Sequence, residues 1–416
     1  MSGFPQELVS ALIKAYDVRG LVDSQLTPDF VRAAGGAFVE AVGLREDGAI
    51  VVGHDMRPSS PAFAQAFAEG AAAHGVDVIL IGLCSTDGLY FASGTLNLPG
   101  AMFTASHNPA AYNGIKMCRA GAAPVGQETG LAEISAMLVA GVPEYDGPPG
   151  RISHREMLQD YADYLIGLVP PLRRRLSVVV DAGNGMAGLT APVVLGQLPV
   201  DVTQMYFELD GTFPNHEANP IDPANLVDLQ AEVIRQGADL GLAFDGDADR
   251  CFVVDERGEL VNPSTLTGLI ATQELQRVPG APVIHNVITS RAVPEIIAEN
   301  GGVPVVTRVG HSFIKETMAQ TGAVFGGEHS GHFYFADFWR ADSGMLAALH
   351  VLSRLSNSSD ATTLSNLLVP YERYVLSGEI NTEVADQSAA IAAVRAHFAG
   401  QDVTFSDLDG LTVDGG

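Results

Sequence analysis

The sequence predicts an α/β protein with three similar α/β domains, each built on a mixed, mostly parallel sheet, and a smaller α+β C-terminal domain. Short β-branched runs are repeatedly followed by amphipathic helical stretches, and segments rich in proline, glycine or serine separate these groups. The 416 residues are also about three times the usual size of a domain. We expect domains over residues 1–146, 150–255, 256–362 and 370–416.

The first group opens the pattern and ends in a polar loop. We expect strands at residues 49–52, 76–81 and 101–104, with a helix over 61–74. Asn108-Pro109 stops the last of these strands. The proline- and glycine-rich residues 141–150 are the first expected linker.

The next two groups repeat this construction. The second has expected strands at 176–181 and 240–244 with a turn at 183–188. The third opens near Asn262 and has strands at 282–285 and 304–306, each followed by a helix. The similarity of the three groups suggests an internal structural repeat, although no motif recurs in the sequence.

The C-terminal part follows a serine- and threonine-rich stretch at 356–363. We expect a strand over 371–384, a helix over about 385–398 and two strands at 403–405 and 411–413. Asp409-Gly410 is typical of a hairpin turn between the last two strands.

Charge and cysteine content exclude several classes of protein. The chain has 23 basic and 49 acidic residues and a net charge of −26, which disfavours binding to nucleic acid or to an anionic membrane. An anionic substrate could bind only where the few cations are gathered. The three cysteines form no CxxC pair, and we find neither a signal peptide nor a membrane span, so we expect a cytoplasmic protein.

The sharpest motif is Asp245-Gly-Asp-Ala-Asp-Arg250, directly after an apolar strand. Its three carboxylates, Asp245, Asp247 and Asp249, form an all-oxygen set that suits Mg²⁺ or Ca²⁺ and not zinc. A calcium-binding hand is excluded because Arg250 stands where that loop needs glycine and the flanks resemble strands. A solvated acidic turn and a covalent nucleophile at Asp245 remain as alternatives.

A second motif, Thr104-Ala-Ser-His-Asn-Pro109, ends another expected strand. Ser106 could be a nucleophile or a phosphate carrier, although no GxSxG elbow surrounds it. Taken alone, a serine before Asn-Pro is more typical of a turn or a helix cap.

Four further motifs complete the pattern: Tyr16-Asp-Val-Arg-Gly20, Tyr112-Asn-Gly-Ile-Lys116, Gly310-His311 and Gly327-Glu-His-Ser-Gly-His332. In this order, with TASHNP and DGDADR, they resemble the α-D-phosphohexomutase family, and most of all its bacterial phosphomannomutase/phosphoglucomutase branch. The resemblance extends from about residue 13 to the end of the chain.

The resemblance implies roles for these residues. Ser106 would be carried as a phosphoserine that completes a Mg²⁺ site with Asp245, Asp247 and Asp249. It would donate phosphate, Arg250 would steady that phosphate, and Lys116, with His332 and Arg19, would handle protons and charge. Glu328 and Ser330 would bind sugar hydroxyls. Further substrate contacts would come from Gly310, His311 and Tyr16.

The implied reaction is the reversible interconversion of mannose 6-phosphate and mannose 1-phosphate, or of the glucose pair, through a 1,6-bisphosphate. The implied partners are sugar phosphates, with glucose or mannose 1,6-bisphosphate as activator, bound in a central cleft between four domains. The chain would be a monomer or a dimer. A phosphoglucosamine mutase and a catalytically silent metal- or sugar-phosphate-binding protein remain as alternatives.

The chain departs from the family pattern in two places. Ile288 stands where some members have a substrate-contacting lysine, and Arg291 is the expected substitute. The Arg-x-Ser-Asn-Thr-Glu-Pro loop that clamps the non-reacting phosphate does not occur in the 416 residues. From this we expect weak binding of sugar phosphate and slow turnover by this chain.

Overall fold

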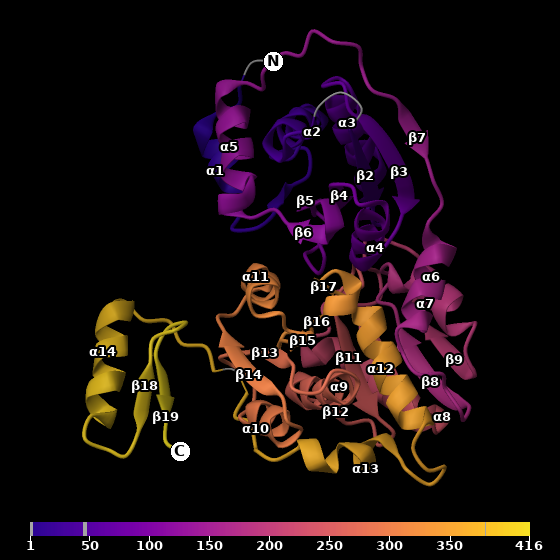
Figure 1. The fold of residues 1–416 in the computed structure, drawn as a ribbon, viewed down its shortest axis with the longest axis vertical. Coiled ribbons are helices and arrows are strands. Elements are labelled where there is room, and N and C mark those ends of the chain that lie inside the picture. Colours follow the sequence, from indigo (N-terminus) through magenta and orange to yellow (C-terminus); the bar gives the residue numbers. More distant parts are fainter. Residues whose placement is uncertain (1–2, 45–47, 379) are drawn as a thin grey trace.

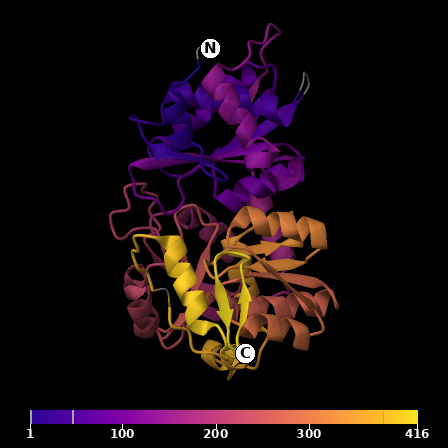
Figure 2. The ribbon, with the colours of Figure 1, turned by 90° about the vertical axis from the view of Figure 1, so that its left-hand side faces the viewer.

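Three larger sheets and one two-stranded hairpin organise the chain, seen here in a computed structural model that describes residues 3–44, 48–378 and 380–416, without the side chains of 311 and 312. In Figure 1 the first sheet and its helices lie at the top, and the second and third sheets lie together below. The C-terminal hairpin stands apart from them at the left of that view. Turned by 90°, it lies in front of the lower part (Figure 2).

The first sheet has the order β1-β5-β4-β2-β3-β7, with β6 paired to β5. Its strands are β1 (Val18–Leu21), β2 (Ala49–His54), β3 (Asp77–Leu83), β4 (Gly100–Phe103), β5 (Tyr112–Arg119), β6 (Ala123–Pro124) and β7 (Ile152–His154). Its helices are α1 (Gln6–Leu12), α2 (Pro28–Val42), α3 (Ser60–Ala72), α4 (Thr86–Leu96) and α5 (Leu131–Ala140).

The second sheet has the order β12-β11-β10-β8-β9. Its strands are β8 (Leu176–Asp181), β9 (Val200–Met205), β10 (Leu240–Phe244), β11 (Cys251–Asp255) and β12 (Leu260–Val261). The helices of this part are α6 (Leu158–Gly167), α7 (Ala187–Leu195) and α8 (Val227–Gln236).

The third sheet has the order β14-β13-β15-β16-β17. Its strands are β13 (Pro282–Asn286), β14 (Val303–Thr307), β15 (Phe325–Gly327), β16 (Phe333–Phe335) and β17 (Ala341–Asp342). The helices that follow the second sheet are α9 (Pro263–Arg277), α10 (Ala292–Glu299), α11 (His311–Thr321), α12 (Gly344–Ser356) and α13 (Leu364–Leu368).

The strand pairings reveal the repeat that the sequence only suggested. In each sheet one central strand (β2, β8 or β13) pairs in parallel with the two strands beside it, and two antiparallel pairings follow. The internal repeat is therefore confirmed at the level of topology. Equivalent loops of the three sheets can consequently be compared directly.

One apolar core joins the three groups. It combines side chains such as Met102 of the first sheet, Leu242 of the second and Phe325 of the third, all fully buried. Helix α12 contributes Leu349 and its neighbours to the same cluster. Because this core is continuous, the three sheets pack together and their loops meet on one side of it.

Most expected elements are present, but two expectations need correction. The strand predicted over 371–384 is wrong: the described residues there form a short 3₁₀ turn, Val369–Tyr371, followed by extended, exposed chain. Side chains such as Val375, which is fully exposed, have no neighbouring strand edge to pair with, and β-propensity without a partner does not form a strand. Strand β7 lies after the linker predicted at 141–150 and yet pairs with β3, so the first sheet continues past it.

The C-terminal hairpin is confirmed. Strands β18 (Thr404–Ser406) and β19 (Thr412–Asp414) pair antiparallel around Asp409-Gly410, beside α14 (Gln387–Phe398). No helix in the described part of the chain is long and apolar enough to cross a membrane.

Candidate active site

Three equivalent loops carry the sequence motifs. The connection from β4 to β5 holds residues 104–111, that from β10 to β11 holds 245–250, and that from β15 to β16 holds 328–332. Each of them joins the third and fourth strands of its sheet, counted across the sheet from β3, β9 or β14. The repeat thus places the serine, the acidic residues and the histidine at corresponding edges of three sheets.

Ser106 lies against the acidic loop of the second sheet. Its Oγ donates a hydrogen bond to Asp245 Oδ2 at 2.8 Å, although 139 residues separate them in the chain. The serine is buried and has a positive φ of 48°, a left-handed conformation that costs a non-glycine residue energy. The turn is held by the backbone N–H of Ser106, which donates to Thr104 Oγ1 at 2.9 Å.

Gly246 permits this close approach of the two loops. A Cβ atom at position 246 would lie 2.5 Å from the backbone oxygen of Ser106, too close for any side chain. The glycine in DGDADR therefore lets the serine loop reach the carboxylates.

Asp245, Asp247 and Asp249 form a buried cluster in which one carboxylate oxygen from each residue lies within 4.8 Å of those of the other two. Oδ1 of Asp247 and Oδ1 of Asp249 are buried and accept no hydrogen bond from the described residues. Oxygen-only donors with unused lone pairs suit a hard divalent cation. The cluster therefore fits Mg²⁺.

Two cations face these three carboxylates. Lys116 Nζ lies 2.7 Å from Asp247 Oδ2 and 2.6 Å from Asp249 Oδ2, and Arg250 Nη2 lies 2.8 Å from Asp245 Oδ2. Lys116 comes from the interior of β5, and Arg250 is the residue before β11. Two of the chain's 23 basic residues thus face the carboxylates.

Burial and charge shift the titration of this cluster. Burial, together with the charges of Asp249 and Asp247, raises the pKa of Asp245 to about 7, although Arg250 acts to lower it. Burial also acts to raise the pKa of Asp247, but Lys116 outweighs it and holds that pKa below its usual range. Ionisation of Asp245 is therefore disfavoured. A bound divalent cation would favour it and so lower the pKa of Asp245.

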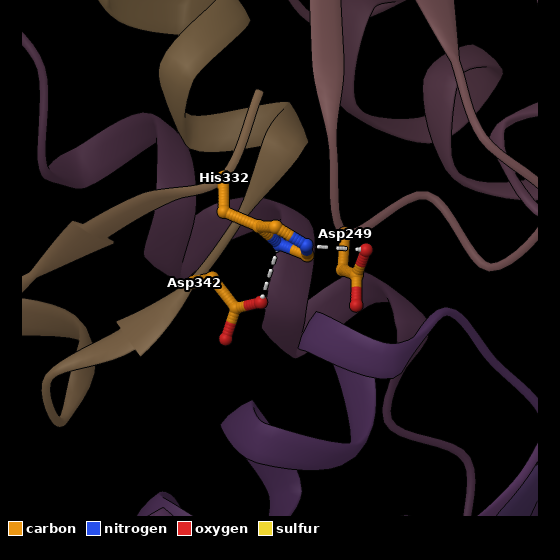
Figure 3. A group of neighbouring side chains, drawn as sticks. All are labelled: Asp249, His332 and Asp342. Carbon is orange, nitrogen blue, oxygen red and sulfur yellow. Dashed lines mark hydrogen bonds and ion pairs between the residues drawn. The ribbon is translucent and has the colours of Figure 1, made fainter. Parts of the chain in front are cut away.

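His332 reaches the same cluster from the third sheet. Its Nδ1 lies 3.0 Å from Asp342 Oδ2 and 3.8 Å from Asp249 Oδ1, so the ring stands between two carboxylates (Figure 3). Burial acts to lower the pKa of His332, but Asp249 and Asp342 outweigh it and raise that pKa. The backbone of His332 also bridges to Arg250, which joins the second and third loops.

Glu328, on the same loop, is buried and firmly held. Its Oε2 accepts from Tyr334 Oη at 2.7 Å, and its Oε1 accepts from the backbone N–H of Gly310 at 3.1 Å and from Asn286 Nδ2 at 3.3 Å. Ser330 is half-buried two residues further along. The orientation of Glu328 is thus set by protein groups.

The remaining predicted residues have different surroundings. Arg19 donates to Asn108 and to Asp17, which ties it to the serine loop. Tyr16 is largely exposed, and Gly310 precedes helix α11, where the side chain of His311 lies outside the described part. Arg291 is half-exposed, and its guanidinium lies 3.5 Å from the carboxylates of both Glu295 and Asp414.

Several residues that support the site were missed in the sequence. Thr86 Oγ1 donates to Asp247 Oδ2 at 2.6 Å. Arg57 donates to three backbone oxygens of the serine loop, those of Ser106, Asn108 and Pro109, and to that of Tyr112 at the start of β5. Neither residue belongs to a motif, and only the fold brings them here. Lys315 could have been noticed because the chain has just three lysines.

Comparison with known proteins gives a consistent family. Models of the phosphoglucomutase/phosphomannomutase α/β/α domains I, II and III match residues 10–140, 159–258 and 262–374. Phosphohexose mutases of Xanthomonas campestris pv. campestris are 39% identical over 407 residues, which is 97% of this chain and 90% of the relative. A Salmonella typhimurium phosphomannomutase is 38% identical over 415 residues, which is 96% of this chain and 89% of the relative.

A solved structure extends this likeness to three dimensions. The crystal structure of a phosphoglucomutase/phosphomannomutase family protein from Burkholderia thailandensis superposes with a TM-score of 0.88 at 34% identity, over 99% of this chain and 89% of that one. The three matched domains, the relatives and the shared fold lead to one conclusion: the chain belongs to the phosphoglucomutase/phosphomannomutase family of α-D-phosphohexomutases and is a hexose-phosphate mutase.

Proposed function

We propose that the chain interconverts the 6- and 1-phosphates of mannose, and of glucose, through a phosphoserine at Ser106 and a 1,6-bisphosphate sugar. The observation that carries this proposal is the contact of the Ser106 hydroxyl with Asp245 inside a buried cluster of three carboxylates and two cations. A serine in that position can pass a phosphoryl group to a sugar hydroxyl while Arg250, at 3.5 Å from its Oγ, balances the phosphate charge.

A Mg²⁺ ion held by Asp245, Asp247, Asp249 and a phosphate oxygen on Ser106 would polarise the transferring phosphoryl group. In the forward step a sugar hydroxyl oxygen bonds to phosphorus while the bond from phosphorus to Ser106 Oγ breaks. The hydroxyl proton passes to a neighbouring base, for which Lys116 and His332 are the candidates in reach of the cluster. In the return step the other phosphate of the bisphosphate sugar reloads Ser106.

We assign recognition of the sugar hydroxyls to Glu328 and Ser330, with Gly310, His311, Tyr16 and Arg291 as further contacts. Arg19 holds Asn108 of the serine loop and balances charge there. We further propose glucose or mannose 1,6-bisphosphate as activator and a monomeric or dimeric chain. The proposed domain limits are 1–146, 150–255, 256–362 and 370–416, with strand β7 of the second segment pairing back onto the first sheet. The reduced, buried thiols of Cys84, Cys118 and Cys251 agree with a cytoplasmic location.

The test combines intact-mass analysis with a mutase assay. Incubation with a 1,6-bisphosphate sugar and Mg²⁺ should add one phosphate to the chain, and Ser106→Ala should abolish both this addition and turnover of mannose 1-phosphate. Rates on mannose, glucose and glucosamine 1-phosphates identify the preferred sugar. A chain that never carries phosphate and turns over none of the three sugars would contradict the proposal.

A further inference from the structure

A buried lysine lies behind the site, where the proposed reaction has no direct use for it. Lys315 projects from α11 and its side chain is 3% exposed. Its Nζ lies 2.7 Å from Asp342 Oδ1 and 4.0 Å from the ring centroid of Tyr90 on α4. Burying an ammonium group is costly unless a carboxylate and an aromatic face compensate it, and both are present here. The charge of Lys315 is thus compensated by specific contacts with Asp342 and Tyr90.

Asp342 divides its carboxylate between two partners. Oδ1 faces the ammonium group of Lys315, and Oδ2 accepts from His332 Nδ1 at 3.0 Å. Asp342 comes from β17 and is itself buried. A carboxylate anchored at one oxygen by a fixed cation offers the other oxygen in a fixed direction.

The chain of contacts leads to one ring nitrogen of His332. Since Nδ1 donates its proton to a carboxylate, the neutral ring must keep Nε2 as the unprotonated nitrogen. Figure 3 shows the ring held between Asp342 on one side and Asp249 on the other. The trio of Asp249, His332 and Asp342 is close enough to hold an ion, but Lys315 already balances Asp342.

We propose that Lys315 and Asp342 are positioning residues that fix the orientation and the Nδ1–H tautomer of His332, so that Nε2 receives the proton of the attacking sugar hydroxyl. This inference rests on the proposed function. As the hydroxyl oxygen bonds to phosphorus, its proton moves to Nε2, and it returns from Nε2 to the oxygen that leaves phosphorus in the reverse step. Neither Lys315 nor Asp342 exchanges a proton with the sugar.

The arrangement also links two parts of the molecule. Tyr90 belongs to the helix α4 whose first residue, Thr86, binds Asp247. Lys315 packs on that tyrosine from α11. Helix α4 therefore supports both the acidic cluster, through Thr86, and the orientation of the His332 ring, through Tyr90, Lys315 and Asp342.

The first test uses Asp342→Asn and Lys315→Met on the full chain with Mg²⁺. Because an amide can donate as well as accept, Asp342→Asn permits the wrong tautomer of His332. We expect kcat to fall about 10- to 100-fold, part of the usual worth of general acid–base catalysis, while KM for mannose 1-phosphate changes little. Lys315→Met should also lower kcat. The double variant should have the same kcat as Asp342→Asn alone, because the lysine acts through Asp342.

Glu274→Gln is a matched control. Glu274 is also a buried carboxylate beside a histidine, with Oε1 at 3.9 Å from His350 Nε2, but it lies on α9 away from the three loops. Its replacement should leave kcat unchanged.

The second test reads the tautomer without turnover. In ¹⁵N-labelled protein the signal of His332, assigned by its loss in His332→Gln, should report the Nδ1–H form, and Asp342→Asn should shift it toward Nε2–H. An Nε2–H tautomer in the unaltered chain, or wild-type kcat in folded Asp342→Asn, would overturn the positioning role. Failure of the proposed function is separate, since it would show as absence of phosphate on Ser106 and of mutase activity in the unaltered chain.

Discussion

Removal of the Arg57 guanidinium should loosen the serine loop and destabilise the fold. The side chain is completely buried, and its Nη1 and Nη2 donate to four backbone oxygens between residues 106 and 112 at distances from 2.6 to 3.0 Å. Its Nε also lies 3.3 Å from Asp55 Oδ2, a fully buried carboxylate. One side chain thus supplies hydrogen-bond donors to the backbone oxygens of a loop that has little secondary structure of its own.

The magnitude follows from these contacts. Breaking a buried ion pair by removing one partner costs about 3–5 kcal/mol, since the other charge stays buried without compensation. The orphaned loop carbonyls would add to this, but such terms are not additive, so we expect Arg57→Met to lose about 3–5 kcal/mol of unfolding free energy. Asp55→Asn added to Arg57→Met should recover about 1 kcal/mol or more, because it removes the stranded charge.

The assay is urea unfolding followed by circular dichroism, together with the rate of phosphate incorporation at Ser106. Arg155→Met serves as the control, since Arg155 is exposed and its side chain makes no hydrogen bond or ion pair with the described residues. We expect the midpoint to fall in Arg57→Met at unchanged m-value, and phosphorylation of the folded fraction to slow. If Arg57→Met has the same urea midpoint and the same rate of phosphorylation as Arg155→Met, the loop does not depend on Arg57 and the reasoning is refuted.

Two further predictions concern the metal cluster and a buried acid. Mg²⁺ at 100 times its dissociation constant should raise the unfolding free energy by about 2.7 kcal/mol, measured as a Tm shift that EDTA reverses; an equal shift in Asp247→Asn would argue against the acidic cluster as its site. Burial raises the pKa of Asp87 from 3.8 to about 6, so the folded state favours the protonated acid. Stability should therefore fall by about 3 kcal/mol as pH rises from about 4 to about 6, and this fall should vanish in Asp87→Asn; a variant that keeps the fall would place its source elsewhere.

Local sequence determined the elements and the chemical motifs. The strands at 176–181 and 240–244 were predicted with the bounds that the structure has, because apolar β-branched runs bounded by polar turns have few alternatives. The acidic loop after the second of these strands was visible for the same reason. The strand expected over 371–384 failed because strand formation depends on an edge to pair with, and local sequence holds no information about that edge.

Tertiary structure alone decided which residues support the site. Ser106 and Asp245 could be joined in advance only by resemblance to a family, since their contact spans 139 residues of chain. Arg57, Thr86, Asp342 and Lys315 lie in no motif with the groups they hold, and their partners are set by how the three sheets share one core. Periodicity and turn chemistry act over a few residues and are written in the sequence, whereas burial and charge pairing depend on distances that exist only after the sheets have packed.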